Sequence, residues 1–223
     1  MNLNLRGETL SLLPQRAIYW QARHMLIIAD IHFGKAASFR AKGIPVPRGT
    51  TTQNLGAIDA LLAAHDVRHI LFLGDFLHAR GAHASATLSA MRAWRARHPG
   101  LRLTLVRGNH DWHAGDPPAD LGLEIVDEPC LVAPFAFSHH PEALDGSYVL
   151  AGHVHPVYRL ATRHDMLRLP CFVLGPEVCI LPSFGAFTGG HEITPAAGMR
   201  FFVAVDERII EVPQPQTRER ERT

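Results

Sequence analysis

The sequence predicts an α/β fold in which a parallel sheet with helical crossovers is followed by a second, largely antiparallel sheet. Up to residue 111, apolar runs that end in a polar residue alternate with segments of helical periodicity. After residue 124 the helical periodicity stops, and short apolar runs follow one another. Alternating strands and helices favour a parallel sheet with right-handed crossovers, whereas successive short strands favour antiparallel pairing.

The first strands and the first helix are expected within residues 8–65. Residues 8–20 indicate two short strands around a turn, and 24–30 (HMLIIAD) indicates a buried strand that ends in an acid. Residues 34–49 are rich in basic residues, Gly and Pro, so we expect a basic loop there. Apolar residues then recur at helical spacing and predict an amphipathic helix over 50–65.

The same pattern repeats through residue 111. HILFLGD (69–75) predicts a second apolar strand, and LRLTLVRGNHD (101–111) a third. Between them, apolar residues at helical spacing predict a helix over 84–98, which Pro99-Gly100 ends. The functional side chains of such sheets gather at the carboxyl ends of the strands.

Seven short apolar segments follow residue 124 and are expected to build the second sheet. They are EIVDE, CLVAPFAFS, YVLAGHVH, RLPCFVLG, EVCILPS, RFFVAV and RIIEV. No linker interrupts the chain, so we expect a single domain over 1–212. The polar tail 213–223 has no core to join, and we expect it to be disordered.

Composition narrows the class of protein. The net charge is +1, so no global field points to a nucleic-acid partner, although a local basic groove is compatible with it. No apolar run approaches the ~20 residues that cross a bilayer, and the N-terminus shows no signal peptide pattern. The three cysteines form no CxxC pair. We therefore expect a cytoplasmic protein without a membrane partner.

Five histidine- and acid-containing motifs carry the chemistry. They are Asp30-Ile-His32, Gly74-Asp75, Gly108-Asn109-His110-Asp111, the pair His139-His140, and Gly152-His153-Val154-His155. In an extended backbone, residues two apart point to one face, so each DxH or HxH pair can reach the same site. Asp75 can bridge two ions through its two oxygens, and Asn109 can offer a neutral carbonyl oxygen.

These residue types predict a two-metal centre. A mixed imidazole and oxygen site favours first-row transition metals over Mg²⁺ or Ca²⁺. We expect two divalent ions, Mn²⁺ in the first place, with Fe or Zn as alternatives. Two ions ~3.5–4 Å apart clamp a phosphate and lower the pKa of a water between them, which would attack the phosphorus. The sequence therefore predicts a metal-dependent phosphoesterase.

The motifs together resemble the calcineurin-like metallophosphoesterase superfamily, whose pattern is DxH, GD, GNH[DE], H and GHxH. The resemblance implies a four-layer αββα sandwich of two mixed β-sheets. It implies one metal held by Asp30, His32, Asp75 and His155, and another held by Asp75, Asn109, His139 and His153. His110 would protonate the leaving group or hold a phosphoryl oxygen, and Asp111 would orient His110. Either His139 or His140 could be the isolated histidine, and we prefer His139 because it ends an apolar run.

The chain also resembles the DNA ligase-associated metallophosphoesterases, also called ligase-associated DNA damage response endonucleases. Segments such as LGDFLHAR and LPSFGAFTGG carry this resemblance. It implies a nuclease in DNA repair, with DNA as substrate and a functional association with a DNA ligase and a helicase.

Substrate contacts are expected around the metal motifs. Candidates are the cations of the 34–48 loop, above all Lys35 and Arg48, together with His78, Arg80 and Arg107 beside the GD and GNHD motifs. The FGAFTGG segment (184–190) offers aromatic rings that either stack on a base or pack into the core.

Two other functions remain open on sequence. The same centre would serve a hydrolase of a small nucleotide or a nucleotide-lipid phosphoester. A binding scaffold that kept the fold without catalysis is a third reading, but no metal position is visibly lost.

Overall fold

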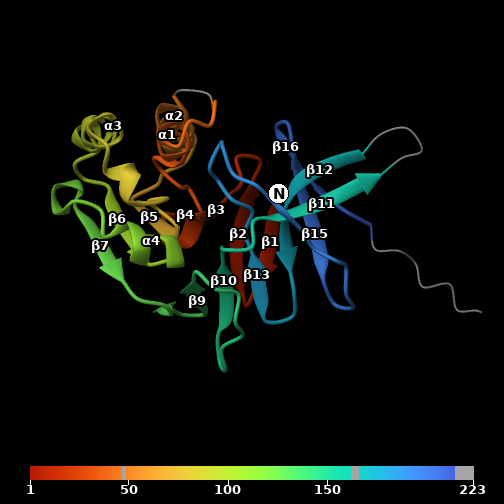
Figure 1. Ribbon diagram of the computed structural model, residues 1–223. Coiled ribbons are helices and arrows are strands. Elements are labelled where there is room, and N and C mark those ends of the chain that lie inside the picture. The colour runs from red at the N-terminus through yellow and green to blue at the C-terminus, as the bar shows by residue number, and fades with distance from the viewer. Residues whose placement is uncertain (47–48, 162–165, 214–223) are drawn as a thin grey trace, which may run out of the picture.

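A seven-stranded mixed sheet forms the first half of the computed structural model, which describes residues 1–46, 49–161 and 166–213 (Figure 1). Its strands follow one another across the sheet in chain order: β1 (Asn2–Leu5), β2 (Glu8–Leu13), β3 (Ala17–Trp20), β4 (Met25–Ala29), β5 (His69–Leu73), β6 (Arg102–Val106) and β7 (Leu123–Val126). The first four pair antiparallel, and β4 to β7 pair parallel. The predicted parallel sheet is therefore confirmed from β4 onward.

Helices cover one face of this sheet. The long ones are α2 (Thr50–Ala64) and α3 (Ser85–Arg97), and the short ones are α1 (Lys35–Ala41) and α4 (Asn109–Ala114). Short 3-10 helices span Gln21–Arg23, Arg80–His83 and Ala119–Leu121. Ile58 of α2 and Trp94 of α3 share one buried cluster with Ile28, Phe72 and Leu105 of the strands. The helices predicted over 50–65 and 84–98 are confirmed to within one residue at each end. None of the described helices is long and apolar enough to cross a membrane.

Nine strands of the second half form the other sheet that the structure describes. They are β8 (Cys130–Val132), β9 (Phe135–Ser138), β10 (Tyr148–Ala151), β11 (Pro156–Ala161), β12 (Met166–Leu174), β13 (Val178–Ile180), β14 (His191–Glu192), β15 (Arg200–Val205) and β16 (Arg208–Glu211). Strand β10 runs parallel to its neighbours β9 and β13, and β11 runs parallel to β14. The remaining pairs are antiparallel, so the sheet is mixed.

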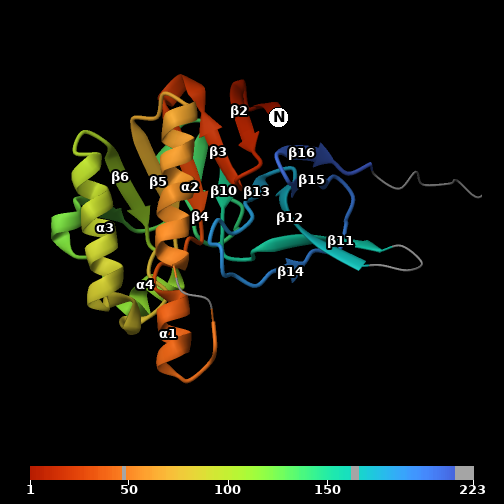
Figure 2. The same ribbon diagram turned by 90° about the horizontal axis from the view of Figure 1, so that it is seen from above.

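The two sheets face each other and bury a common apolar core. Trp20, Ile27 and Leu71 from the first sheet meet Phe137 and Phe172 from the second. Alternate residues of β4 and β5 point instead to the helices, so these strands are buried on both faces. This burial explains why their sequences are continuous apolar runs. The layers run from helices to first sheet to second sheet (Figures 1 and 2).

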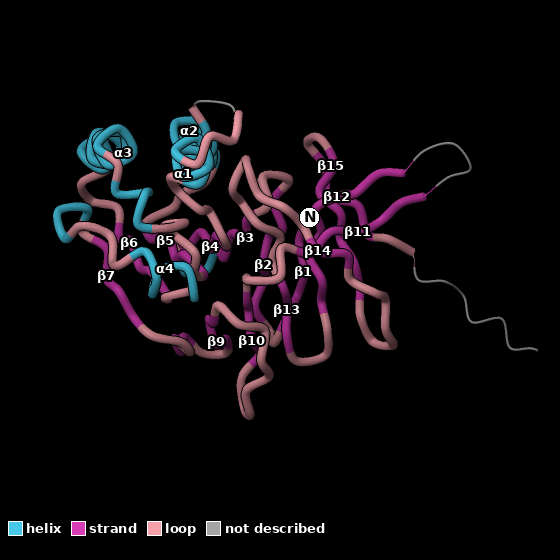
Figure 3. Tube along the Cα trace, in the orientation of Figure 1, coloured by secondary structure: helices cyan, strands magenta, loops and turns pink. Residues whose placement is uncertain are grey.

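Several features differ from the expectations. Residues 35–41 form α1 rather than a loop, and the strands β1, β11 and β14 were not expected. The segment EIVDE joins the first sheet as β7, parallel to β6, because periodicity alone does not assign a strand to a sheet. The implied α/β fold with two mixed β-sheets is confirmed, although all helices of the described residues precede Gly122 and cover the first sheet (Figure 3). Most of the predicted tail, 214–223, lies outside the described residues.

Candidate metal centre

The motif residues gather where strands of both sheets end. Asp30, Asp75 and Asn109 follow β4, β5 and β6, whose carboxyl ends share one edge of the first sheet. His139 and His153 follow the parallel strands β9 and β10 of the second sheet. A hydrogen bond joins the two halves, because the backbone N–H of His153 donates to Asp30 Oδ2 at 2.9 Å. Each sheet therefore supplies one half of the centre.

The backbone at these motifs is left-handed rather than extended. Of the nine non-glycine residues with positive φ in the described chain, five are candidate ligands: Asp30 (52°), His32 (49°), Asp75 (47°), His153 (69°) and His155 (52°). Strands β4 and β10 end before these residues. The extended-strand explanation of the DxH and HxH spacing is therefore wrong. Such conformations cost of order 1 kcal/mol or more each, and they cluster at functional sites.

One group of ligand atoms consists of Asp30, His32, Asp75 and His155. Their candidate atoms all lie within 4.8 Å of one another. His32 Nε2 lies 3.2 Å from His155 Nε2 and 3.6 Å from Asp75 Oδ2. Asp30 Oδ1 is buried without a hydrogen-bond partner in the described chain, and His155 Nε2 is 3.5 Å from it. A buried carboxylate oxygen without a donor, facing imidazole nitrogens, fits a bound cation.

A second group lies on the other side of Asp75. His139 Nε2 is 2.9 Å from Asn109 Oδ1, 3.0 Å from His153 Nδ1 and 3.5 Å from Asp75 Oδ1. The other nitrogen of His139, Nδ1–H, donates to the Leu73 carbonyl at 3.3 Å. This tautomer turns the Nε2 lone pair toward the oxygen of Asn109, so two electron pairs face each other unless a cation lies between them. Asp75 offers one oxygen to each group, as a bridging carboxylate would.

The two adjacent histidines have different surroundings. The His139 side chain is fully buried, and burial lowers its pKa to about 4, which keeps the ring neutral. His140 is half-exposed, and its Nδ1–H donates to Glu128 Oε1 at 2.6 Å. Glu128 Oε2 also accepts from the backbone N–H of both histidines. Burial alone would raise the pKa of Glu128, but these bonds and one from Ser138 lower it to about 2. Glu128 was not predicted as a site residue, since nothing around it in the sequence suggests an anchor.

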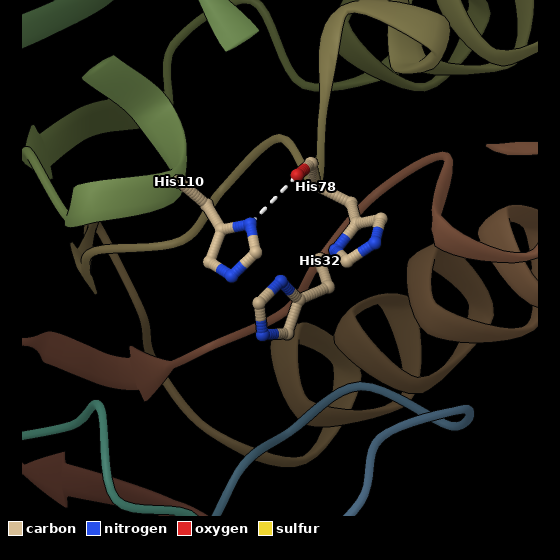
Figure 4. A group of neighbouring side chains, drawn as sticks. All are labelled: His32, His78 and His110. Atoms are coloured by element: carbon tan, nitrogen blue, oxygen red, sulfur yellow. Dashed lines mark hydrogen bonds between the residues drawn. The ribbon is translucent and has the colours of Figure 1, made fainter. Parts of the chain in front are cut away.

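Three imidazoles form a further cluster beside the first group (Figure 4). The rings of His78 and His110 stack with centroids 4.9 Å apart, and His32 meets both rings edge-on. His110 Nδ1–H donates to the His78 carbonyl oxygen at 2.8 Å. Burial, with the positive charge of Lys35, lowers the pKa of His78 to about 4. His110 Nε2, which lies 3.9 Å from Asp75 Oδ2, remains directed toward the centre.

Asp111 does not orient His110 directly, and that expectation is corrected. Its Oδ1 accepts from the backbone N–H of Leu77 and its Oδ2 from that of Gly108, both at 3.0 Å. Burial raises the pKa of Asp111 to about 6. The carboxylate thus ties the loop after β5 to the loop after β6. In the described residues the imidazole of His110 is held by His78 instead.

Glycines at two motifs allow the loops to approach closely. Gly74 has φ of 69°, and an added Cβ would collide with the His139 ring and the backbone of Gly108. A Cβ on Gly108 would lie 2.6 Å from Asp75 Oδ1. Only glycine fits at both positions, and this steric restriction explains why the GD and GNHD motifs each begin with glycine.

The expected substrate contacts are placed unevenly. Lys35 begins α1. Burial lowers the pKa of Lys35, and the nearby charges of Asp75 and Asp30 offset only part of this shift. Arg80 is exposed at the start of a 3-10 helix, and Arg48 lies outside the described residues. Arg107 pairs with Asp116 and Asp127 at 2.8 Å, and its guanidinium lies over the Trp112 ring. A phosphate contact by Arg107 is not supported, because carboxylates already occupy its donors.

Asn54 is another residue beside the site that was not predicted from sequence. It is buried on the apolar side of α2, where its side chain donates to the Ile31 carbonyl and accepts from the backbone N–H of Ala186. It therefore joins the DxH loop to the FGAFTGG segment. A polar residue within the apolar helical pattern was the available signal. In that segment Phe184 is buried in the helix-side core, and Phe187 packs edge-on against Phe39.

Imidazoles, carboxylates and one amide that converge where two facing sheets end define a metal-dependent phosphoesterase. The calcineurin-like phosphoesterase family matches residues 24–139, and the chain belongs to this family. The crystal structure of the nuclease MPE of Pseudomonas putida superposes with a TM-score of 0.85 at 48% sequence identity. That match covers 95% of this chain and 99% of the other.

A second solved structure is only remotely similar. A protein of unknown function from Aquifex aeolicus is 19% identical with a TM-score of 0.39, over 59% of this chain and 78% of that one. No match was found among curated proteins.

Proposed function

We propose that this chain is a two-metal nuclease that hydrolyses phosphodiester bonds in DNA. The observation that carries the proposal is the 48% identity, over 95% of the chain, to a solved nuclease. The same chain brings all seven candidate ligands together at one edge of the sandwich. The centre alone defines a phosphoesterase, and the relative supplies the reason to favour DNA.

The seven side chains would hold two divalent ions. We assign Asp30, His32, Asp75 and His155 to one ion, and Asp75, Asn109, His139 and His153 to the other. Mn²⁺ is the proposed metal, with Fe and Zn as alternatives, because the donors mix imidazole nitrogen with oxygen. When bound, the two ions would act as Lewis acids on the phosphate and lower the pKa of a water for attack.

His110 would donate a proton to the leaving group or hold a phosphoryl oxygen. Since its Nδ1–H is donated to the His78 carbonyl, the exchangeable proton is the one on Nε2. That nitrogen lies 3.9 Å from Asp75 Oδ2 and so faces the candidate centre. A proton carried on Nε2 could be donated to a phosphoryl oxygen or to the departing oxygen.

A role in DNA repair, in association with a DNA ligase and a helicase, is proposed from the sequence motifs that resemble the ligase-associated group. A cytoplasmic location is proposed with it. The three cysteines are free in the structure, which suits a reducing compartment.

One panel of substrates tests the nuclease proposal. The protein, stripped with chelator and reloaded with Mn²⁺, is assayed on nitrophenyl mono- and diesters, nucleotides, a nucleotide pyrophosphate, and single- and double-stranded DNA. We expect cleavage of the diester and of DNA, both abolished by chelator. Hydrolysis of nucleotides or of the pyrophosphate without DNA cleavage would favour the small-molecule hydrolase. Failure on every ester after metal uptake would favour the scaffold.

A further inference from the structure

A groove opens beside the metal centre on the side of His155. It encloses about 250 Å³, and its walls come from the β2–β3 turn, β11, β12 and the loop before β14. Ten described residues line it, among them Arg16, His155 and Arg168. Two of them are arginines and none is acidic. The groove shares His155 with the centre, so a strand of substrate held by the metals could continue into it.

The topology of the first sheet brings Arg16 to this place. Ala17 pairs with Ile28, so the turn before β3 lies beside the carboxyl end of β4, where Asp30 begins the centre. The turn is tight: the Arg16 N–H donates to the Leu13 carbonyl at 2.9 Å, and φ of Arg16 is 65°. Its position at the centre is therefore a consequence of strand order.

Among the residues that the structure describes, the guanidinium of Arg16 has no partner. It makes no hydrogen bond or ion pair with any residue that the structure describes, although the side chain is half-buried. Burial also lowers its pKa. A partly desolvated cation without a counter-charge is costly, and such groups are normally paired. An anion bound in the groove would supply the missing counter-charge.

Arg168 approaches from β12 and is held in place. Its Nη2 donates to the Gly190 carbonyl at 2.6 Å, and the neighbouring Gly189 carbonyl accepts from His155 Nδ1 at 3.3 Å. One short loop thus links the arginine to a candidate metal ligand. The remaining guanidinium donors of Arg168 are available to a ligand, because a guanidinium carries five N–H groups.

We propose that Arg16 and Arg168 form a phosphate subsite that binds a phosphodiester of the DNA strand next to the one cleaved. This inference rests on the proposed nuclease function. Two planar guanidiniums suit phosphate oxygens, which they bind through paired hydrogen bonds. The contact positions the strand without reading its bases. The same chemistry would accept a terminal phosphate monoester of a short strand.

The test compares the double variant R16Q/R168Q with R16K/R168K, which keeps the positive charge but loses the paired hydrogen bonds of the planar guanidinium. The matched control is R68Q/R102Q, which removes the same charge from exposed arginines at the opposite ends of the parallel strands. Each Mn²⁺-loaded protein is assayed for binding to a single-stranded oligonucleotide against salt, and for kcat/KM on DNA and on bis-nitrophenyl phosphate. Oligonucleotides with and without a 5′-phosphate distinguish the terminal monoester from an internal diester.

We expect R16Q/R168Q to lower kcat/KM on DNA about tenfold or more relative to the nitrophenyl diester, and to reduce the salt slope by roughly 0.7, the value for one phosphate contact on a single strand. The lysine pair should restore part of the slope, and R68Q/R102Q should match the parent. Equal losses on DNA and on the small diester, or an unchanged salt slope, would overturn the subsite while leaving the nuclease intact. A parent protein that hydrolyses the diester but neither binds nor cleaves DNA would overturn the nuclease function and this subsite together.

Discussion

Asp75 is the side chain that connects the two ligand groups. Its Oδ2 lies 3.6 Å from His32 Nε2 and its Oδ1 lies 3.5 Å from His139 Nε2. Asp75→Asn replaces one of these oxygens with an NH₂ donor, which a cation does not accept as a ligand. We expect the variant to retain about one metal ion or fewer, and to lose phosphodiesterase activity by orders of magnitude while staying folded.

Elemental analysis, activity and circular dichroism of Asp75→Asn check this outcome. Asp66→Asn is the control, since Asp66 is an exposed carboxylate paired with Arg68. Two bound ions with parental activity in Asp75→Asn would contradict a bridging role.

His110 offers a separate test of proton transfer. A positioned general acid contributes typically ~10²–10⁴-fold, so His110→Asn should lower turnover by about that factor while keeping the metals. The loss should be smaller on nitrophenyl esters, because their leaving groups need little protonation. The neighbouring His113→Asn serves as control, because the His113 ring is exposed and bonds to the Asn109 carbonyl of its own helix. Equal losses on good and poor leaving groups would assign His110 to phosphate binding instead.

Motif residues were predictable because their chemistry restricts the residue type. Asp30 and His155 could be assigned from sequence because few side chains bind a metal, and the structure gathers both. The contacts of Asp111 and Arg107 could not be predicted from sequence. A carboxylate or a guanidinium has many possible partners, and only the tertiary structure selects among them. Arg16 carried no local signal at all, because its position follows from strand order.

Asp59 joins the two long helices. On α2 it accepts from the indole N–H of Trp94 on α3 at 2.7 Å and from Arg97 at 2.8 Å. Burial alone would raise the pKa of Asp59, but hydrogen bonds from Arg97, His98 and Trp94 lower it below the usual 3.8. A carboxylate with a depressed pKa stabilises the fold above its unfolded pKa, and this contribution is lost as pH falls through the folded value.

We therefore expect Asp59→Asn to unfold about 1–2 kcal/mol more easily than the parent near pH 7, as for a lost hydrogen bond to a charged group. The difference should shrink as the pH falls below 3.8. Urea titrations across that range measure it. Asp120→Asn breaks the exposed pair with Arg92 of α3, and it should lower the free energy of unfolding by less than about 1 kcal/mol. An equal cost in both variants, or a difference independent of pH, would contradict the role of Asp59.

Strands buried on both faces were predicted well from sequence. A short helix bounded by glycines and the sheet assignment of one strand were not. Strands β4 and β5 lie between two apolar layers, so their composition alone reveals them. Helix α1 has a left-handed Gly34 before it and a turn at Gly43 after it, and these glycines led to the expectation of a loop. The sheet to which β7 belongs depends on pairing with β6, which periodicity does not encode.

Metal binding should stabilise the whole molecule. The two halves of the centre are far apart in the chain, since His32 and His155 are separated by 123 positions in sequence, so the ions would act only on the folded state. At a metal concentration about 100 times Kd, one site contributes ~2.7 kcal/mol by mass action. We expect a rise in Tm of several degrees with Mn²⁺ and a much smaller one with Ca²⁺. Thermal scans check this, and a shift in Asp75→Asn equal to that of the parent would contradict it.

The division of the core between two sheets also bears on the order in which a ribosome makes them. Strands β1 to β7 are complete at Val126, yet their inner face, with Trp20, Ile27 and Leu71, is covered only by strands that begin at Cys130. Until those strands emerge, a nascent chain would present a broad apolar sheet surface of the kind that aggregates or recruits chaperones. Such a chain also lacks His139, His153 and His155. A fragment that ends near residue 126 should therefore be insoluble and metal-free, even though it contains four of the seven candidate ligands.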